Sequence, residues 1–216
     1  VQQWVTVCAQ AVNRLAEAVP GSESPREGLV SLIASTWALP APPSPTLLVS
    51  LVEGAFIGGG TPPRGDGEGV GLAAAVEILE KLALRPERVW KAAAEGAAAA
   101  KGGLAQALST LLSRSQQAQP WQEAAQQGAS ASLLTLRGVA ALLRILPPSG
   151  VAADVRSQLP YLLMRIVQST TSASGAVPTP HKLELCRVSL EATRASLGWL
   201  PIPQLASFLY SLSAVL

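Results

Sequence analysis

The chain has 216 residues, of which 49% are hydrophobic and only 14% are charged, with a formal net charge of +2. This composition excludes a disordered chain, and the length is sufficient for one elongated domain or two small ones. Because a typical soluble protein is about one quarter charged, we expect part of the surface to be covered by neighbours. Polar residues, glycine or proline interrupt every apolar run before about 18 residues, so no membrane span is expected.

Three helices are predicted in the first part of the chain, over residues 2–18, 24–38 and 46–57. Pro20-Gly21 ends the first helix, and Ser24-Pro25 supplies an N-cap and a first-turn proline for the second. Four prolines between positions 40 and 45 form a connector that no helix can cross. Residues 1–57 are therefore expected to form a group of N-terminal helices.

Residues 58–71 read GGGTPPRGDGEGVG and contain seven glycines without apolar periodicity. This composition predicts a flexible surface loop, followed by a helical-repeat region over 72–216. Gly69-x-Gly71-x-x-Ala74 is similar to a dinucleotide-binding turn, but no buried strand precedes it. Arg64-Gly65-Asp66 is the integrin-binding tripeptide, but nothing else in the chain indicates secretion.

A longer series of helices is predicted in the second part of the chain. They cover residues 72–84, 89–100, 104–115, 129–146, 151–168, 181–198 and 201–216. Pro160 predicts a break or kink in the helix that contains it. The alanine-rich run from Ala92 to Ala100 permits a close approach between helices. No segment alternates apolar and polar residues over the length of a strand.

The last segment, PIPQLASFLYSLSAVL, has the clearest amphipathic pattern. Six apolar residues fall on one side of the predicted helix: Leu205, Phe208, Leu209, Leu212, Val215 and Leu216. Because a single helix of this length is marginal alone, one face must pack. The preceding helix, joined through a tight turn at 199–201, is the expected partner.

The element Leu-x-x-x-Leu recurs along the chain and indicates a repeated architecture. It occurs at Leu47/Leu51, Leu104/Leu108, Leu159/Leu163 and Leu205/Leu209. The second leucines are 57, 55 and 46 residues apart, which is irregular but compatible with helical pairs of about forty residues. We therefore predict an all-α fold, an irregular helical-repeat (α-solenoid-like) stack of about ten helices. An irregular all-α domain without repeats is the alternative.

Few residues could support catalysis or metal binding. The one histidine, His181, follows Pro-Thr-Pro at a predicted helix start, where a capping or surface role is expected. Cys8 and Cys186 are expected to be buried reduced thiols, which favours a reducing compartment or an organelle interior. Glu77 and Glu80 are close on one helix face, but Lys81 accompanies them. We expect a noncatalytic protein with no metal, no cofactor and no small-molecule substrate.

The two parts of the chain differ in charge. Residues 1–100 carry seven basic and ten acidic side chains, a net of −3, whereas residues 101–216 carry nine and four, a net of +5. Arginine suits phosphate through its planar fork of donors, so an RNA-binding stripe across stacked helices is predicted. Its candidate residues are Arg137, Arg144, Arg156, Arg165, Arg187 and Arg194. The alternative is a solvated face whose arginine stems cover apolar neighbours.

Two segments resemble helices of the octotricopeptide and heptatricopeptide repeats of organellar RNA-binding proteins, relatives of the FAST-kinase-like and RAP-domain proteins. Residues 202–216, IPQLASFLYSLSAVL, look like the second helix of such a repeat, with Tyr210 where tryptophan is usual. Residues 84–90, LRPERVW, followed by the alanine-rich run, are similar to the first helix of a pair. The resemblance implies RNA binding, or service as a subunit of an organellar ribosome or similar assembly.

These observations give a leading hypothesis and an alternative. The first is a noncatalytic helical-repeat subunit of a large organellar RNA-containing assembly, similar to a mitochondrial ribosome. Its arginine-bearing C-terminal half would contact RNA, and other protein subunits would be its partners. The alternative is a protein–protein scaffold without nucleic acid contact, and the alternative location is the cytoplasm or nucleus. Because the chain begins at Val1, we expect a fragment or a processed product, with any targeting segment outside it.

Overall fold

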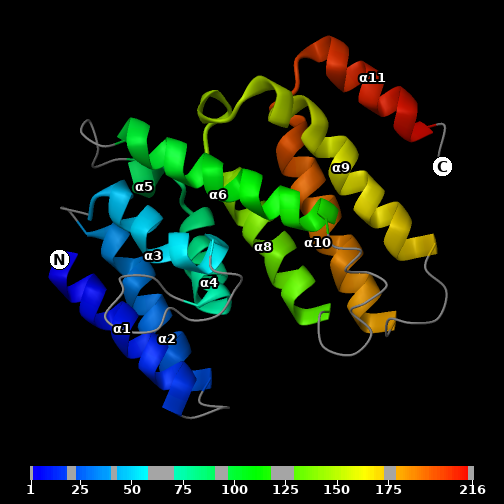
Figure 1. Cartoon of the computed structure of the whole chain (residues 1–216). Helices are drawn as coiled ribbons and strands as arrows, with labels where there is room; N and C mark the ends of the chain where they lie inside the picture. The colour runs from blue at the N-terminus through cyan, green and yellow to red at the C-terminus, as the bar shows by residue number, and fades with distance from the viewer. Residues whose placement is uncertain are drawn as a thin grey trace.

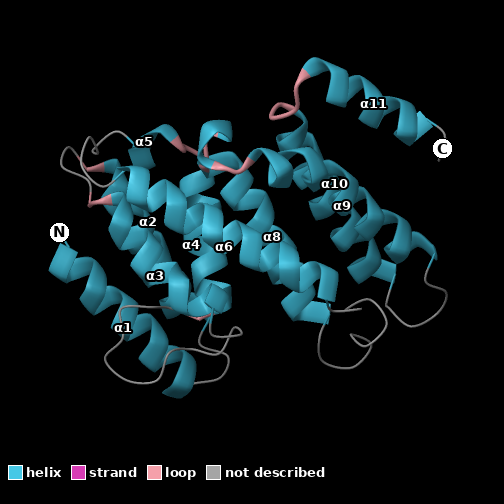
Figure 2. Cartoon of the chain, turned by 45° about the horizontal axis from the view of Figure 1, so that its top comes forward, coloured by secondary structure: helices cyan, strands magenta, loops and turns pink. Residues whose placement is uncertain are grey.

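The computed structural model describes residues 2–18, 23–39, 43–57, 71–90, 97–117, 129–172 and 179–213. These residues form ten α-helices and two short 3-10 helices, with no strand among them (Figures 1 and 2). The all-α class predicted from the sequence is therefore confirmed. The α-helices are α1 (Gln2–Ala18), α2 (Glu23–Ser35), α3 (Pro45–Ile57), α4 (Leu72–Ala83), α5 (Glu87–Trp90), α6 (Ala97–Gln117), α8 (Ala129–Ile145), α9 (Ala153–Ser172), α10 (Thr179–Leu197) and α11 (Ile202–Ser213), and the 3-10 helices are η1 (Thr36–Ala38) and η2 (Pro148–Gly150).

The helices pack against their neighbours in two layers. One row consists of α2, α4, α8 and α10, each in contact with the next (Figure 1). The other layer holds α1, α3, α6 and α9, each of which packs against the helix of the first row that follows it in the chain. Within this second layer α3 contacts α6, and α9 contacts α11. The result is a series of stacked helix pairs, the arrangement of an α-solenoid-like fold.

The recurring Leu-x-x-x-Leu element marks one layer of this stack. Its first three copies lie on α3, α6 and α9, which are all second-layer helices, and the fourth lies on α11. Leu47/Leu51, Leu104/Leu108 and Leu159/Leu163 are all buried, with exposed fractions of 0% to 2%. In the last copy Leu205 is only half-buried and Leu209 is exposed. The first three copies are therefore core positions, and the fourth is incompletely covered.

The central helix α4 is buried on most of its surface. It contacts α2, α3 and α8, and eight of its twelve residues are buried. Ile78 and Leu79 are fully buried in it, and burial of each such side chain contributes roughly 1.5–3 kcal/mol. Alanines at positions 74 and 75 are also buried, so the neighbouring helices can approach closely there.

One helix differs from the prediction at a pair of glycines. The sequence suggested a boundary between the alanine-rich run and a helix starting at residue 104, but α6 runs without interruption from 97 to 117 through Gly102 and Gly103. A Cβ built on Gly103 would lie 2.6 Å from Cγ1 of Val49 on α3. Gly103 therefore allows α6 to pack closely against α3. Glycine is unfavourable inside a helix, and the close contact with α3 offsets that cost.

The sequence predicted a break or a kink at Pro160, and the helix is not broken there. Helix α9 continues through this residue from 153 to 172, and Pro160 is buried. A proline inside a helix lacks the N–H that would bond to the carbonyl four residues earlier, so α9 loses one hydrogen bond there. Packing of the buried ring and of Leu159 and Leu163 accounts for the persistence of the helix.

The partner predicted for the last helix was wrong. Helix α11 makes its main contact with α9, not with the preceding α10. The ring of Phe208 lies edge-on to that of Tyr161 on α9, with centroids 5.2 Å apart, and Phe208 is buried. The α10–α11 turn is real, with backbone hydrogen bonds from Trp199 and Leu200 to the end of α10. The turn carries the chain into the second layer, where α9 is the neighbour.

Other expectations lie partly outside the described residues. The loop predicted over 58–71 is described only at Gly71, and the alanine-rich helix predicted over 89–100 only at 89–90, the end of α5, and at 97–100, the start of α6. The division into regions 1–57, 58–71 and 72–216 therefore stays a prediction. No helix in the described part is long and apolar enough to cross a membrane.

Candidate arginine face

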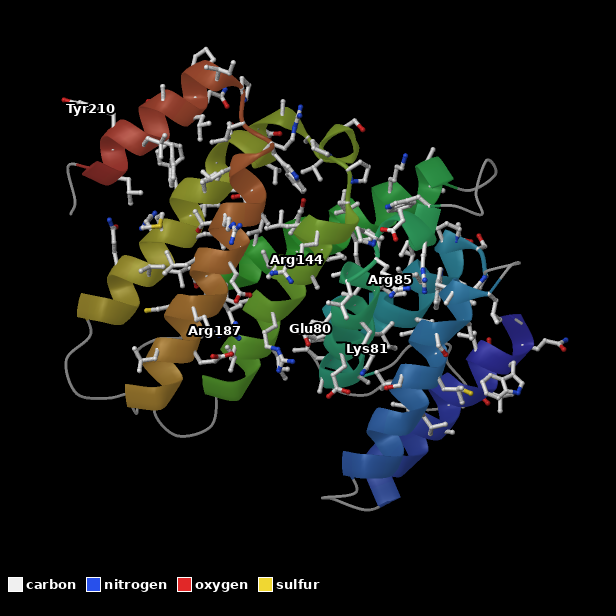
Figure 3. All side chains as sticks on the ribbon, turned by 180° about the vertical axis from the view of Figure 1, so that it is seen from behind. Glu80, Lys81, Arg85, Arg144, Arg187 and Tyr210 are labelled. Carbon is white, nitrogen blue, oxygen red and sulfur yellow. The ribbon has the colours of Figure 1, made fainter. Side chains whose placement is uncertain are left out.

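The candidate site lies along the contact between α8 and α10, called the seam below. Arg144 of α8 bonds Glu191 of α10, and Glu184, one helical repeat of seven residues earlier, acts electrostatically on Arg137. Arg137 is therefore near Glu184, and Arg144 is near Glu191. Because the residue numbers rise together along both helices, α8 and α10 are parallel. Arg137, Arg144 and Arg187 are thereby collected on one face of the first row, where Figure 3 labels Arg144 and Arg187.

Arg137 is held by a carboxylate from the next helix of the row. Its Nε and Nη2 donate to Oε1 and Oε2 of Glu80 on α4, at 2.7 and 2.5 Å. Both side chains are about one third exposed. The hydrogen bond to Glu80 raises the pKa of Arg137 above its usual range, with further support from the charges of Glu77 and Glu184. The pair therefore links α4 to α8 as a bidentate clamp.

Arg187 and Arg144 share the carboxylates of α10. Arg187 donates to both oxygens of Glu184, at 2.8 and 2.6 Å, and to Glu191 at 2.5 Å. Arg144 reaches Glu191 at 3.5 Å from α8. The bonds to Glu184 raise the pKa of Arg187. These groups are well exposed, so each pair adds little stability, but together they balance the positive charge of the seam.

The other three candidate arginines do not complete a stripe. Arg156 and Arg165 are both on α9, in the other layer, and nine residues place them on opposite sides of that helix. Arg156 is half-buried, and its Nε has no hydrogen-bond partner in the described part. Arg165 and Arg194 are exposed and form no ion pair with any described residue. The six residues are thus divided between paired and unpaired sites on separate surfaces.

Sequence reasoning missed the carboxylates that neutralise this face. Glu184, Arg187 and Glu191 are spaced three and four residues apart on one helix, and this local signal was available. Glu80 is 57 residues from Arg137, and its role depends on the contact between α4 and α8. A face that is basic by residue count is therefore close to neutral where Arg137, Arg144 and Arg187 meet Glu80, Glu184 and Glu191.

No metal centre is assembled in the described residues. They hold no group of three histidine, cysteine or acidic side chains that could bind a metal ion. The side chain of His181 lies outside the described residues. Cys8 is buried, and burial raises the pKa of its thiol, which makes it less reactive. Cys186 is a thiol on α10 and is half-buried, so the prediction of a buried thiol is confirmed for Cys8 and wrong for Cys186.

The sequence analysis also missed a set of exposed apolar side chains at the C-terminal end of the stack. They are Leu183 and Leu190 on α10, with 66% and 49% exposed, and Ile202 and Leu209 on α11, with 83% and 48% exposed. Side chains of this size are normally covered in a monomer when they gather on one surface. The amphipathic pattern of the last helix was recognised, but not that Leu209, on its apolar side, is exposed.

Comparison with known proteins found no match to this chain. No family model matches the chain, and neither a curated protein nor a solved structure matches it.

Proposed function

We propose that this chain is a noncatalytic helical-repeat scaffold that binds other proteins as a subunit of a larger assembly. The observation that carries the proposal is the group of exposed apolar side chains on α10 and α11 at one end of the stack. Solenoid-like folds present extended surfaces for partners, and their terminal repeats need covering. The neutralised seam between α8 and α10 supports protein contact over phosphate contact.

Co-purification tests this proposal. The chain is isolated under native conditions with a tag, with and without ribonuclease, and the bound proteins are identified by mass spectrometry. We expect a defined set of proteins that remains after ribonuclease treatment. Recovery of RNA with no stoichiometric protein, or loss of every protein on ribonuclease treatment, would contradict the scaffold.

RNA binding is a second candidate, supported by Arg165 and Arg194. Both are exposed and carry no carboxylate partner in the described residues. The resemblance to organellar repeat proteins supports the same function and a location in the mitochondrion or another organelle. RNA contact would then involve fewer arginines than the six predicted from the sequence.

The arginines divide into a test pair and a control. If Arg165 and Arg194 contact phosphates, replacing both by glutamine should flatten the log–log salt dependence of single-strand binding by about 1.4. Arg137→Gln is the control, since Arg137 is already bound to Glu80 and should not change that slope. An unchanged slope in the double variant, or no RNA binding at low salt, removes RNA as a candidate.

A further inference from the structure

Each new helix of the first row packs in the same way. Helix α4 contacts α2 and α3, α8 contacts α4 and α6, and α10 contacts α8 and α9. In each case the new helix lies against the previous helix of its row and the preceding helix of the other layer. By the same rule, a further first-row helix would lie against α10 and α11, and the described residues contain no such helix.

Helix α10 presents an apolar stripe to that place. The stripe consists of Leu183, Cys186, Leu190 and Leu197, spaced three, four and seven residues apart. At about 100° per residue, it is centred roughly 120° around α10 from Glu184 and Glu191, whose side chains reach the α8 side. The same angle separates it from the buried strip of Leu185, Ser189, Ala192 and Ser196. The stripe therefore faces neither α8 nor the interior.

Helix α11 presents a second apolar side to the same place. Phe208 is buried against α9, and Ile202 and Leu209 lie roughly 100° to 120° further around the helix, both exposed. Leu209 is the second leucine of the recurring element, and its counterparts Leu51, Leu108 and Leu163 are fully buried. The helices that carry these three leucines, α3, α6 and α9, each pack against the first-row helix that follows them in the chain. In the described part, no first-row helix follows α11. The exposure of Leu209 thus matches a missing helix.

Charge gives the chemistry of the missing helix. On α8, an arginine pair seven residues apart binds carboxylates of both neighbours, through Arg137 to Glu80 of α4 and through Arg144 to Glu191 of α10. An equivalent pair, Arg187 and Arg194, recurs on α10 with the same spacing. Arg187 forms ion pairs with Glu184 and Glu191 of its own helix. Arg194, in contrast, is exposed and forms no ion pair in the described residues. A helix packed on α10 would bring a carboxylate to Arg194.

We propose that the open edge, formed by Leu183, Cys186, Leu190 and Leu197 of α10 with Ile202 and Leu209 of α11, binds an amphipathic α-helix of a partner protein. This helix runs in the direction of α10, places a leucine-rich side on the open edge and carries a glutamate or aspartate opposite Arg194. Recognition follows the helix-in-groove mode, in which anchors recur every three or four residues. The inference rests on the proposed scaffold function and names the kind of partner.

The probe is a synthetic peptide with the sequence of α10, a helix that packs on the preceding first-row helix, α8, within the chain. A fluorescein-labelled peptide of residues 179–200 carries the α10 sequence that packs on α8 and offers Glu191 to Arg144. Cys186→Ser in the peptide leaves the thiols of the full chain as the only ones present. Binding to the full chain is followed by fluorescence anisotropy and, independently, by the rate at which Cys186 of the chain reacts with a maleimide.

We expect saturable binding that slows the labelling of Cys186 but leaves that of buried Cys8 unchanged. Leu190→Glu in the chain should weaken binding by at least about tenfold, because it places a charge in the apolar contact. Leu32→Glu is the matched control, since Leu32 is an exposed leucine on α2 at the other end of the stack. It should bind the peptide as the unmodified chain does. Should Leu190→Glu unfold the chain, Leu183→Glu replaces it.

Charge exchange tests the predicted contact of Arg194. Arg194→Glu in the chain should weaken binding about fivefold, and Glu191→Arg in the peptide should restore most of that loss. The inference is overturned if the unmodified chain shows no saturable binding, if Leu190→Glu binds as well as Leu32→Glu, or if Cys186 is not protected. A discrete dimer of the chain alone that Leu190→Glu abolishes would also overturn it, because a second copy would then occupy the open edge.

The two proposals fail in different ways. If ribonuclease-resistant proteins still co-purify with the Leu190→Glu chain, the scaffold stands and the open edge is not the binding surface. If no protein co-purifies with the unmodified chain, the scaffold function fails regardless of the peptide result.

Discussion

Arg137 is an arginine whose availability for phosphate changes once the chain is folded. Two of its three guanidinium nitrogens, Nε and Nη2, donate to Glu80, so a phosphate that bound to the same pair of nitrogens would have to displace a bidentate carboxylate. The same holds in weaker form for Arg187, which already binds two carboxylates. At the scale of single residues, the basic character of the second half of the chain is therefore smaller on its surface than in its composition.

Replacement of Arg137 by glutamine should reduce stability. It removes the clamp between α4 and α8, and for a pair that is about one third exposed we expect a loss of about 1 kcal/mol in the free energy of unfolding. Urea denaturation followed by circular dichroism measures the change. Arg165→Gln is the comparison, since Arg165 is exposed without an ion pair in the described part, and it should lie within about 0.5 kcal/mol of the unmodified chain. Equal stabilities for the two variants would show that the clamp contributes nothing.

Ser189 gives a second prediction at this scale. Its side chain is fully buried on α10, and its Oγ has no hydrogen-bond partner in the described residues. A buried hydroxyl without a partner carries a desolvation cost, so Ser189→Ala should raise the free energy of unfolding by about 1 kcal/mol. Thermal or urea unfolding would report it. A loss of stability instead would mean that the hydroxyl is bonded in solution.

At the scale of elements, the contact between α6 and α3 depends on Gly103. An alanine there would place its Cβ 2.6 Å from Val49, whose branched side chain is restricted at χ1. We expect Gly103→Ala to cost about 1–3 kcal/mol, as overpacked core positions do.

Gly102→Ala is the matched control for that substitution. Gly102 is on the same helix, one residue away, and an added Cβ would meet nothing within 4 Å. Helix propensity alone should then stabilise the chain by about 0.5–1 kcal/mol. Opposite signs in the two variants would confirm the packing role of Gly103, and matching signs would refute it.

Helix α11 packs against α9 through an aromatic pair. Phe208 is its buried anchor, packed against Tyr161 of α9. Phe208→Ala should therefore release α11 while leaving the rest of the fold intact. Hydrogen exchange measured by mass spectrometry should show lost protection over 202–213 and unchanged protection in α4 and α8. Global destabilisation would indicate that α11 is a part of the main core.

At the scale of the whole molecule, stability should be graded along the stack. In a repeated helical array each pair contacts only its neighbours, so central helices lose more contacts on opening than terminal ones. Helix α4 is covered on several sides, whereas α1 and α11 lie at the ends of the series (Figure 1). Native-state hydrogen exchange should be slowest in α4 and α8 and fastest in α1 and α11. Uniform protection would indicate a single cooperative core.

Much of the secondary structure followed from the sequence by itself. Helix ends at Ala18, Ile57 and Leu197 were predicted within one residue, because glycine and proline terminate helices locally. The leucine element predicted a repeat, and it does mark one layer. These features depend on neighbouring residues in the chain, so periodicity and end signals are sufficient to find them.

Only the tertiary structure decided what surrounds each residue. The role of Gly103 depends on Val49, the pairing of Arg137 on Glu80, and the partner of α11 on the position of α9. In each case the two residues or helices are far apart in sequence, and no local pattern records which of them meet. The sequence therefore determines that this chain forms amphipathic helices in pairs. Which arginines keep their charge available, and which apolar side remains uncovered at the open edge, is determined by long-range packing, because neutralisation and burial both require a neighbour in space.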